Sequence, residues 1–566
     1  MHVPAGYVSN GVIYPPQCLP SCPIRSVLDL KHEFSLPPIL LWNPLTSQGL
    51  QIHCYVCDEK MYQSSWNDGS LQYNSPRLLQ DLKSHVLLVS AVYSCKNGHK
   101  LLSHDERVLN KVSHAFIPFV LLHKSGFTKD FVNFCCTFCE GGMNFHSLEK
   151  AVSQMRWQYY EDRKQVYSEY ANSIDVIEQD QFHIASFTQV YAQYLPSDDA
   201  LCQCFVTSFL TNENKYRSHL QSMPVGECLS VDHTYKVASN IGYFRGDRKW
   251  VSQYDGAFIV FNKDGKIVSW QYTKCGSFKE VKPVLEALAD RGTTQGNAVK
   301  TVYVDNCCQW RNKLQGIFGP TCKVKLDIFH TVQRVVQKIP KKHPFHSQCA
   351  MDLGQVFRDE GDNGMKRTKP TPSSAKILAN LNSFVSRWEN VVYDGKHVLC
   401  VAALDEIDKL KVHINKGCLS DIPTGCGTNR NEAFHRYIRT FFHRSRVGIL
   451  VAYALMMVII YQFNSNEGSS RKKLVKPITS CSTLSLPYEP MGIVNTSSTS
   501  RDFTWYQESC NNEELIDHSA LVQLVQQSVH QYQLMTQMNN HSSTATELWK
   551  FIQYSQVIPF LSTTNE

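Results

Sequence analysis

Residues 228–337 carry strand and helix patterns in an order that leaves few ways for this part of the chain to fold. The first three patterns are strands, and the turn Asn262-Lys263-Asp264-Gly265 joins the second to the third with an Asp-Gly pair that favours a tight hairpin. A helical period of apolar residues follows, and two further strands then alternate with helices. The expected strands are 228–237, 256–261, 266–272, 299–305 and 323–327, and the expected helices are 278–291, 309–318 and 328–339.

This order predicts a mixed sheet. Three strands joined by short connections are antiparallel, and strands reached through helical crossovers are added in parallel. The order β-β-β-α-β-α-β-α is that of an RNase H-like fold. The fold class we expect is therefore α/β, with an RNase H-like mixed sheet core.

Two aspartates lie on strands that are neighbours at the centre of such a sheet. Asp232 lies on the first strand and Asp305 ends the fourth. A third carboxylate is expected from a later helix, and Glu432 fits, with Thr428 or Asn429 as the helix cap. Three carboxylates are the smallest cage for two Mg²⁺ ions that serve phosphoryl chemistry. An aspartate at the end of a strand is often only a cap, and the case here depends on all three occurring together.

In order and context, Asp232, Asp305 and Glu432 resemble the DDE triad of eukaryotic cut-and-paste transposases. The long separation of Asp305 and Glu432 resembles the helical insertion of the Mutator, hAT, P and Kolobok superfamilies. Those groups carry a Cys/Asp-x-x-His motif after the second aspartate, as Asp327-Ile328-Phe329-His330 does here. The resemblance covers roughly residues 225–460. No THAP or BED finger of the usual spacing is present.

The resemblance implies an enzyme, a transposase or polynucleotidyl transferase, in which the triad binds Mg²⁺ or Mn²⁺ and cuts and joins DNA strands. Asp327, His330 and His435 would support the catalytic site. DNA is the implied partner, as transposon terminal repeats and target DNA. A homo-oligomer and a nuclear location are implied by the need to pair two ends of a chromosomal element. A domesticated derivative without activity, or another RNase H-like nuclease, is the alternative; an exonuclease of the DEDD type would show Asp-x-Glu where this chain has Asp232-His233-Thr234.

Two cysteine motifs predict a structural Zn²⁺ site in residues 46–110. Cys54 and Cys57 form a Cys-x₂-Cys knuckle, and Cys95 and His99 supply a second pair. Four such ligands around a tetrahedral ion make a structural zinc site. His104 is an alternative to His99 as the fourth ligand, and unligated core cysteines are the alternative to zinc.

Basic residues mark candidate contacts with DNA phosphates. The net charge of +7 permits a nucleic-acid partner without requiring one. In residues 111–195, two helical patterns broken at Gly141-Gly142 resemble a helix-turn-helix, and a plain scaffold is the alternative. The second of these helices carries Lys150, Arg156, Arg163 and Lys164. The DNA-binding residues expected near the catalytic centre are Lys338, Lys341, Lys342, Arg436 and Arg439.

The apolar run 447–463 is shorter than the roughly 20 residues of a membrane span, so we expect a buried continuation of the helix of Glu432 and no membrane partner. The plentiful cysteines and the absence of a signal-peptide pattern lead us to expect reduced thiols. The remaining divisions we expect are an extended Pro-rich arm at 1–45, the first part of the core at 225–340, a helical insertion at 341–424, the helix of the third carboxylate at 425–464 and a polar, partly disordered tail at 465–566.

Overall fold

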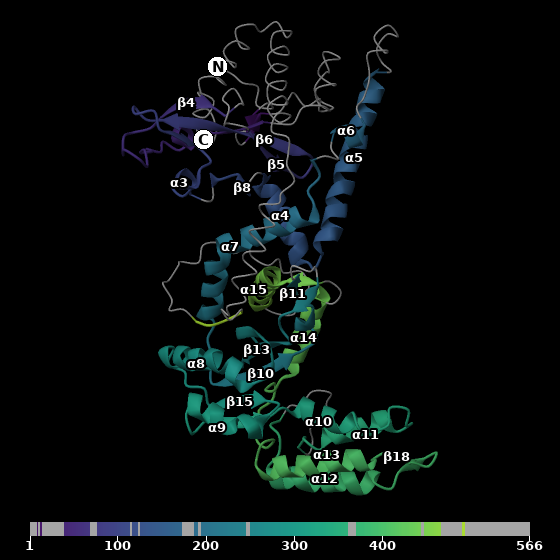
Figure 1. Ribbon diagram of the computed structural model, residues 1–566. Helices are drawn as coiled ribbons and strands as arrows, with labels where there is room; N and C mark the ends of the chain where they lie inside the picture. Colours follow the sequence, from purple (N-terminus) through teal and green to yellow (C-terminus); the bar gives the residue numbers. More distant parts are fainter. Residues whose placement is uncertain are drawn as a thin grey trace. The chain divides into compact units, whose positions relative to one another are not determined.

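The computed structural model is a mixed α/β protein with several sheets (Figure 1). It describes residues 8–9, 12–13, 39–67, 76–113, 116–122, 125–171, 186–190, 194–244, 249–359, 369–442, 446–465 and 489–492. The chain divides into two compact units, and the boundary between them falls at Phe209 and Leu210, inside helix α7 (Asp198–Ser222).

The N-terminal unit is built on a mixed sheet of order β1-β2-β3-β6-β5-β9-β8, with β4 and β7 also paired to β6. The long β6 is buried along almost its whole length, as expected of a central strand. The strands are β1 (Val8–Ser9), β2 (Val12–Ile13), β3 (Ile39–Trp42), β4 (Tyr62–Trp66), β5 (Arg77–Gln80), β6 (His85–Ser94), β7 (Lys100–Leu102), β8 (Phe119–Leu121) and β9 (Gly126–Thr128). The helices of this unit are α2 (Pro44–Ser47), α3 (Glu106–Leu109), α4 (Lys129–Glu140), α5 (Phe145–Ala171) and α6 (Phe187–Val190).

One feature of this unit differs from the sequence-based expectations, and another agrees with them. β3 lies inside the range assigned to an extended arm; its residues ILLW are apolar, and β3 pairs in parallel with β6, far away in sequence. Only β1 and β2 are described in the rest of that range, so most of the arm lies outside the described residues. The break at Gly141-Gly142 does separate α4 from α5, and the φ of +92° at Gly142 is one that glycine adopts without strain.

The C-terminal unit contains a five-stranded sheet of order β14-β13-β10-β15-β16. β10 pairs antiparallel with β13 and parallel with β15, so the sheet is mixed as predicted. These strands are β10 (Cys228–Thr234), β13 (Gly256–Asn262), β14 (Ile267–Thr273), β15 (Thr301–Val304) and β16 (Lys323–Leu326). The helices are α8 (Phe278–Thr294), α9 (Cys307–Phe318), α10 (Ile328–Val336), α11 (His346–Gln355), α12 (Ser374–Trp388), α13 (Val401–Asn415), α14 (Asn429–Phe442) and α15 (Ile449–Ser465).

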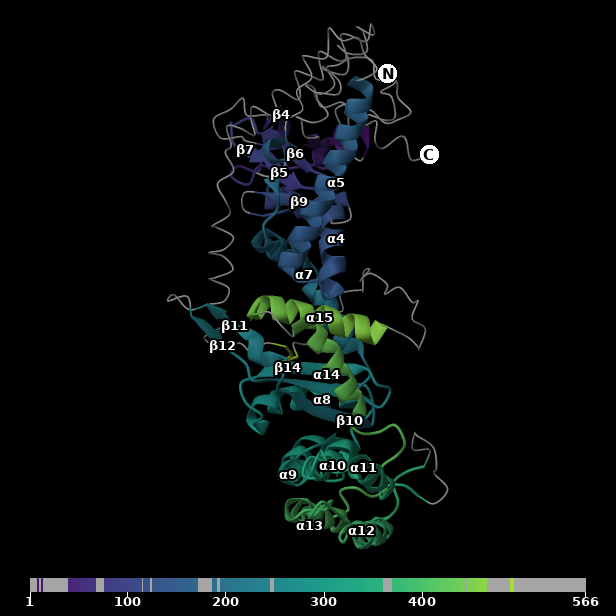
Figure 2. The same cartoon turned by 90° about the vertical axis from the view of Figure 1, so that its right-hand side faces the viewer.

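The two faces of the sheet are covered by different helices because side chains alternate along each strand. Leu229 and Val231 of β10 belong to the same buried cluster as side chains of α8, α9 and α10, and this cluster extends into α11, α12 and α13. Ser230 and Asp232 project to the opposite face. There α14 packs on β10 and β13, and Figure 2 shows α14 and α15 beside the sheet.

A three-stranded sheet and a small hairpin were not expected from the sequence. β11 (Ile241–Phe244) pairs with β12 (Trp250–Ser252) and, in parallel, with β19 (Val447–Gly448). The hairpin of β17 (Val392–Tyr393) and β18 (Lys396–His397) lies between α12 and α13. β19 interrupts the expected continuation of the helix of Glu432, so α14 and α15 are separate helices.

Helix α15 carries most of the apolar run, and most of its side chains are buried. The hydroxyl of Tyr272 on β14 donates to the carbonyl of Ala452 on α15, at 3.1 Å. Among the described residues, every helix is too short or too polar to span a membrane. Residues 489–492, which fall in the expected tail, lie against β14: Tyr272 N–H donates to the Gly492 carbonyl at 2.8 Å. Apart from Ser465, which ends α15, the rest of that tail lies outside the described residues.

Candidate active site and metal centre

The register of the central strands places the first two carboxylates side by side. Ser230 lies opposite Tyr303 in the parallel pairing of β10 with β15. Asp232 and Asp305 each follow two residues later, so their side chains leave the same face of the sheet. This is the face that α14 covers, and α14 carries Glu432.

Helix α14 is fixed on the sheet by buried polar contacts that the sequence patterns did not single out. The Ser230 hydroxyl lies 2.8 Å from the side-chain oxygen of Asn431 and 3.0 Å from the carbonyl of Gly427. The Asn431 amide donates to the carbonyl of Ile259 at 3.2 Å. Asn431 is fully buried and directly precedes Glu432, so these contacts set the rotation of α14. The sequence signal for these contacts is the polar Asn431 at a position where the period of Phe434, Ile438 and Phe442 predicts a buried residue.

His330 lies at the centre of the three carboxylates. Its Nε2 is 3.5 Å from Asp232 Oδ2 and 3.5 Å from Glu432 Oε1, and its Nδ1 is 3.4 Å from Asp305 Oδ2. His435, one turn along α14 from Glu432, has its Nδ1 3.7 Å from Asp232 Oδ2. The structure therefore brings Asp232, Asp305, Glu432, His330 and His435 together from four separate elements.

The electrostatics of this cluster follow from burial and crowding. Burial, and then the charge of Asp232, raise the pKa of Asp305 to about 7. Burial alone would lower the pKa of His330, but the adjacent Asp232 and Asp305 outweigh it and raise the pKa to about 9. Burial lowers the pKa of His435 to about 4. At neutral pH the site thus holds a charged and a neutral imidazole.

The side chain of Asp327 accepts hydrogen bonds from two backbone N–H groups next to the site. Its Oδ1 accepts the His330 N–H at 3.0 Å and caps α10, while its Oδ2 accepts the Thr428 N–H at 2.7 Å, just before α14 begins. It is therefore a positioning residue that links His330 to the helix of Glu432. Thr428 or Asn429 is expected to cap α14. The buried hydroxyl of Thr428 has no hydrogen-bond partner among the described residues, and the Thr428 backbone N–H donates to Asp327 instead.

The carboxylates have spare capacity for a cation. Oδ2 of Asp232 and Oδ1 of Asp305 are buried and form no hydrogen bond with any described residue. Carboxylate oxygens are the ligands that Mg²⁺ and Mn²⁺ prefer. The donor set of Asp232, Asp305 and Glu432 therefore fits a divalent cation of this kind.

The basic residues expected to contact DNA differ in their exposure to solvent. Lys338, Lys341 and Lys342 are exposed at and beyond the end of α10; on α14, Arg436 is exposed and Arg439 is half-buried. Arg156, expected to contact phosphate, is fully buried. It donates to the side chain of Gln80 and to the carbonyls of Asp81 and Tyr194, so that expectation is wrong for this residue.

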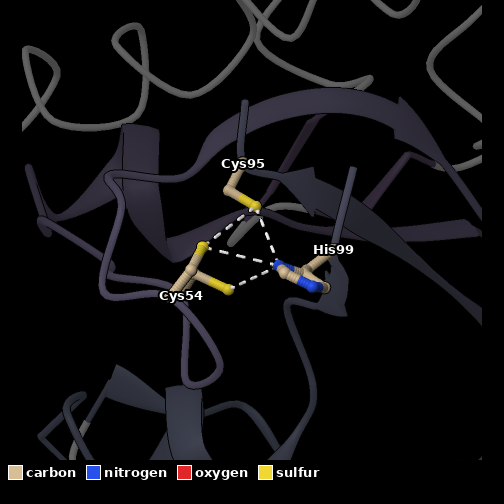
Figure 3. Close-up of side chains that lie close together, drawn as sticks. Cys54, Cys95 and His99 are labelled. Carbon is tan, nitrogen blue, oxygen red and sulfur yellow. Dashed lines mark hydrogen bonds between the residues drawn. The ribbon is translucent and has the colours of Figure 1, made fainter. Parts of the chain in front are cut away.

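The predicted zinc ligands converge in the N-terminal unit (Figure 3). Nδ1 of His99 lies 3.5 Å from Cys54 Sγ, 3.4 Å from Cys57 Sγ and 3.4 Å from Cys95 Sγ. The Sγ atoms of Cys57 and Cys95 are 3.7 Å apart. His104, the alternative fourth ligand, instead hydrogen-bonds the Ser90 hydroxyl at 2.7 Å.

Two tight turns hold these ligands. The Asp58 N–H donates to the Cys54 carbonyl and the Cys54 N–H to the Glu59 carbonyl, while Cys95 and His99 are joined by a backbone bond across a turn. Burial alone would raise the pKa of the Cys54 thiol, but the backbone amides of Val56 and Cys57 outweigh it, and the pKa is lowered. Such turns resemble the knuckles that present thiolates to a metal.

No protein-family model matches this chain, and a search of curated proteins finds no match either.

Proposed function

We propose that this protein is a DDE-type DNA transposase, or a domesticated derivative of one, that binds transposon-end DNA and cuts and joins its strands with Mg²⁺ or Mn²⁺. The observation that carries the proposal is the convergence of Asp232, Asp305 and Glu432 on one face of a sheet of order β14-β13-β10-β15-β16. This mixed sheet supports an RNase H-like core, in which α11–α13, which lie between Asp305 and Glu432 in the sequence, would be the helical insertion.

In this proposal the three carboxylates hold the divalent cations. Bound there, the cations would activate an attacking oxygen and stabilise the leaving oxygen of a phosphodiester. Asp232 Oδ2 and Asp305 Oδ1, which are buried and form no hydrogen bond with any described residue, support this assignment. His330, which lies within 3.5 Å of all three carboxylates, would bind a phosphate oxygen of the DNA beside them. His435 would orient Asp232, and Asp327 would hold His330 and Glu432 in register.

The surroundings suit a DNA substrate. Lys338, Lys341 and Lys342 are exposed and free of described ion pairs, and with Arg436 and Arg439 they would bind the phosphate backbone. In the N-terminal unit, the Cys54–Cys57–Cys95–His99 cluster would hold a structural Zn²⁺, and α4 and α5 would contribute to DNA binding. Action on paired ends of chromosomal DNA would require a homo-oligomer in the nucleus.

A second candidate is a catalytically silent DNA-binding protein derived from a transposase. His330 favours it, because a protonated imidazole within 3.5 Å of all three carboxylates offsets part of their charge without a metal ion. The two candidates differ in one observable: the first cleaves DNA when Mg²⁺ or Mn²⁺ is added, and the second does not.

The test uses the purified full chain, Mg²⁺ or Mn²⁺, and labelled duplexes copied from the genomic sequence on either side of its coding region. We expect strand cleavage that Asp232→Asn, Asp305→Asn and Glu432→Gln each reduce to background without loss of DNA binding. Asp290→Asn, an exposed carboxylate on α8, is the matched control and should cleave normally. Binding without cleavage would select the second candidate, and the absence of both would refute the proposal.

A further inference from the structure

A second cluster of metal-ligating side chains lies in the C-terminal unit, formed by Cys307, Cys308, His413 and Cys418. The sequence patterns did not reveal it, because two of the cysteines are adjacent and the other ligands follow about a hundred residues later. Cys307 and Cys308 begin α9, His413 lies in the last turn of α13, and Cys418 lies in the loop that follows.

We propose that these four residues bind a structural zinc ion that ties the helical insertion to the sheet core. A tetrahedral ion with Zn–S bonds of about 2.3 Å and Zn–N bonds of about 2.0–2.1 Å separates its sulfur ligands by about 3.8 Å and a sulfur from a nitrogen by about 3.6 Å. Cys308 Sγ lies 3.9 Å from Cys307 Sγ and 3.8 Å from Cys418 Sγ. His413 Nδ1 lies 3.7 Å from Cys307 Sγ and 3.3 Å from Cys308 Sγ.

The surroundings favour thiolates, which are the form that binds zinc. Cys307 and Cys308 occupy the first turn of α9, where the free N–H groups and the helix dipole stabilise negative charge. Arg311, one turn further along α9, donates from Nη2 to Cys418 Sγ at 3.0 Å.

The loop that carries Cys418 is held in place independently of any metal. The Leu326 N–H donates to the Cys418 carbonyl at 2.9 Å, and Lys325 Nζ donates to the carbonyls of Gly417 and Ser420. Both donors lie on β16. The fourth ligand is therefore preorganised beside the sheet, and a metal there would fasten α13 to α9.

Cysteine thiolates and imidazole at tetrahedral spacing favour zinc over Mg²⁺ and Mn²⁺, which prefer the oxygen ligands of the carboxylate site. Two other readings of the same contacts give different measurable results. In one, the three thiols and the His413 imidazole lie together without a metal; in the other, Cys308 and Cys418 form a disulfide.

The test measures zinc by elemental analysis in the full chain purified under reducing conditions. We expect two zinc ions per chain in the wild type, one in Cys308→Ser and one in Cys54→Ser. Cys308 is exposed, so its replacement by serine opens no cavity. Cys275→Ser, another exposed cysteine of the same unit, is the matched control and should keep both ions.

Hydrogen exchange of residues 413–420 gives a second readout. Cys308→Ser should speed exchange there, as should a chelator added to the wild type, whereas Cys275→Ser should not. Zinc content equal in Cys308→Ser and wild type would overturn the proposal, as would a Cys308–Cys418 disulfide found by mass spectrometry of a second preparation that was purified without reductant and with its free thiols blocked. Neither outcome bears on the carboxylate site, so the two proposals fail independently.

Discussion

Asp327 offers the sharpest test of how the candidate active site is held together, because its two oxygens fix two different elements. Oδ1 accepts the backbone N–H of His330, and Oδ2 accepts the backbone N–H of Thr428. Asp327 is only 2% exposed, so water cannot replace either contact without opening the structure. Asp327→Ala removes both contacts, whereas Asp327→Asn keeps an oxygen for one and places an amide group where the other N–H points.

The magnitudes follow from the type of each contact. Loss of the helix cap costs about 1 kcal/mol. A buried hydrogen bond to a charged group is worth about 2 kcal/mol, which corresponds to roughly 30-fold faster local amide exchange. Asp327→Ala should therefore cost about 3 kcal/mol in all and raise exchange at both His330 and Thr428. Asp327→Asn should raise exchange chiefly at Thr428.

The assay is hydrogen exchange of the full chain, resolved to the amides of His330 and Thr428. A pair of glycine variants provides an independent control. Gly425 and Gly427 both have positive φ, so alanine is strained at each, but only at Gly427 would the added carbon lie 2.8 Å from Asp327 Oδ2. Gly427→Ala should accelerate Thr428 exchange more than Gly425→Ala does. Unchanged Thr428 exchange in Asp327→Asn would refute the reasoning.

Three further predictions concern the N-terminal unit. Burial, and then Arg156, lower the pKa of His85 to about 3 in the folded protein, whereas His85 of the unfolded chain is protonated below about pH 6.5. The free energy of unfolding should therefore fall as the pH drops below 6.5, by about 2 kcal/mol at pH 5. Thermal unfolding measured against pH should show this fall in the wild type and a smaller one in His85→Phe. Arg156→Met should destabilise the unit by about 3 kcal/mol or more in urea unfolding, because three acceptors lose a charged donor. Lys150→Met, on the same helix but exposed, should change the stability by no more than about 0.5 kcal/mol. Equal effects of the two substitutions would contradict the buried role of Arg156. Cys54→Ser should release zinc from its cluster and lower the melting temperature of the full chain, and a variant that melts like the wild type would argue against a structural metal.

Local patterns predicted the elements of the five-stranded sheet well, because each strand and helix there has its own periodicity. The expected strand 228–237 corresponds to β10, and the hairpin at Asn262–Gly265 joins β13 to β14. Convergence of Asp232 with Asp305 followed from strand order and the two-residue alternation of side chains. These properties reside within short stretches of sequence.

The features that were missed depend on partners far away in the sequence. β11 is completed by Val447 and Gly448, and nothing within either segment specifies the other. β3 is apolar, but its Pro-rich surroundings predict an extended arm. Only its parallel pairing with β6 shows that it is a strand of the sheet. Arg156 reads as a surface cation by residue type, and only the acceptors on β5 and in the following turn show that it is buried.

The turn from β15 to α9 connects the two proposed metal centres. Asp305 ends the strand side of this turn and Cys307 begins the helix side, with only Asn306 between them. A zinc ion on Cys307 and Cys308 would therefore hold the backbone beside Asp305 while fastening α13 of the insertion to the same point. The Arg334 guanidinium adds a further restraint by donating to the Asp305 carbonyl at 3.0 Å. On this reasoning α13 would support the second carboxylate. Loosening it should disturb Asp305, which lies just beyond the end of β15, more than Asp232, which lies within β10 and is paired with Ile259 of β13.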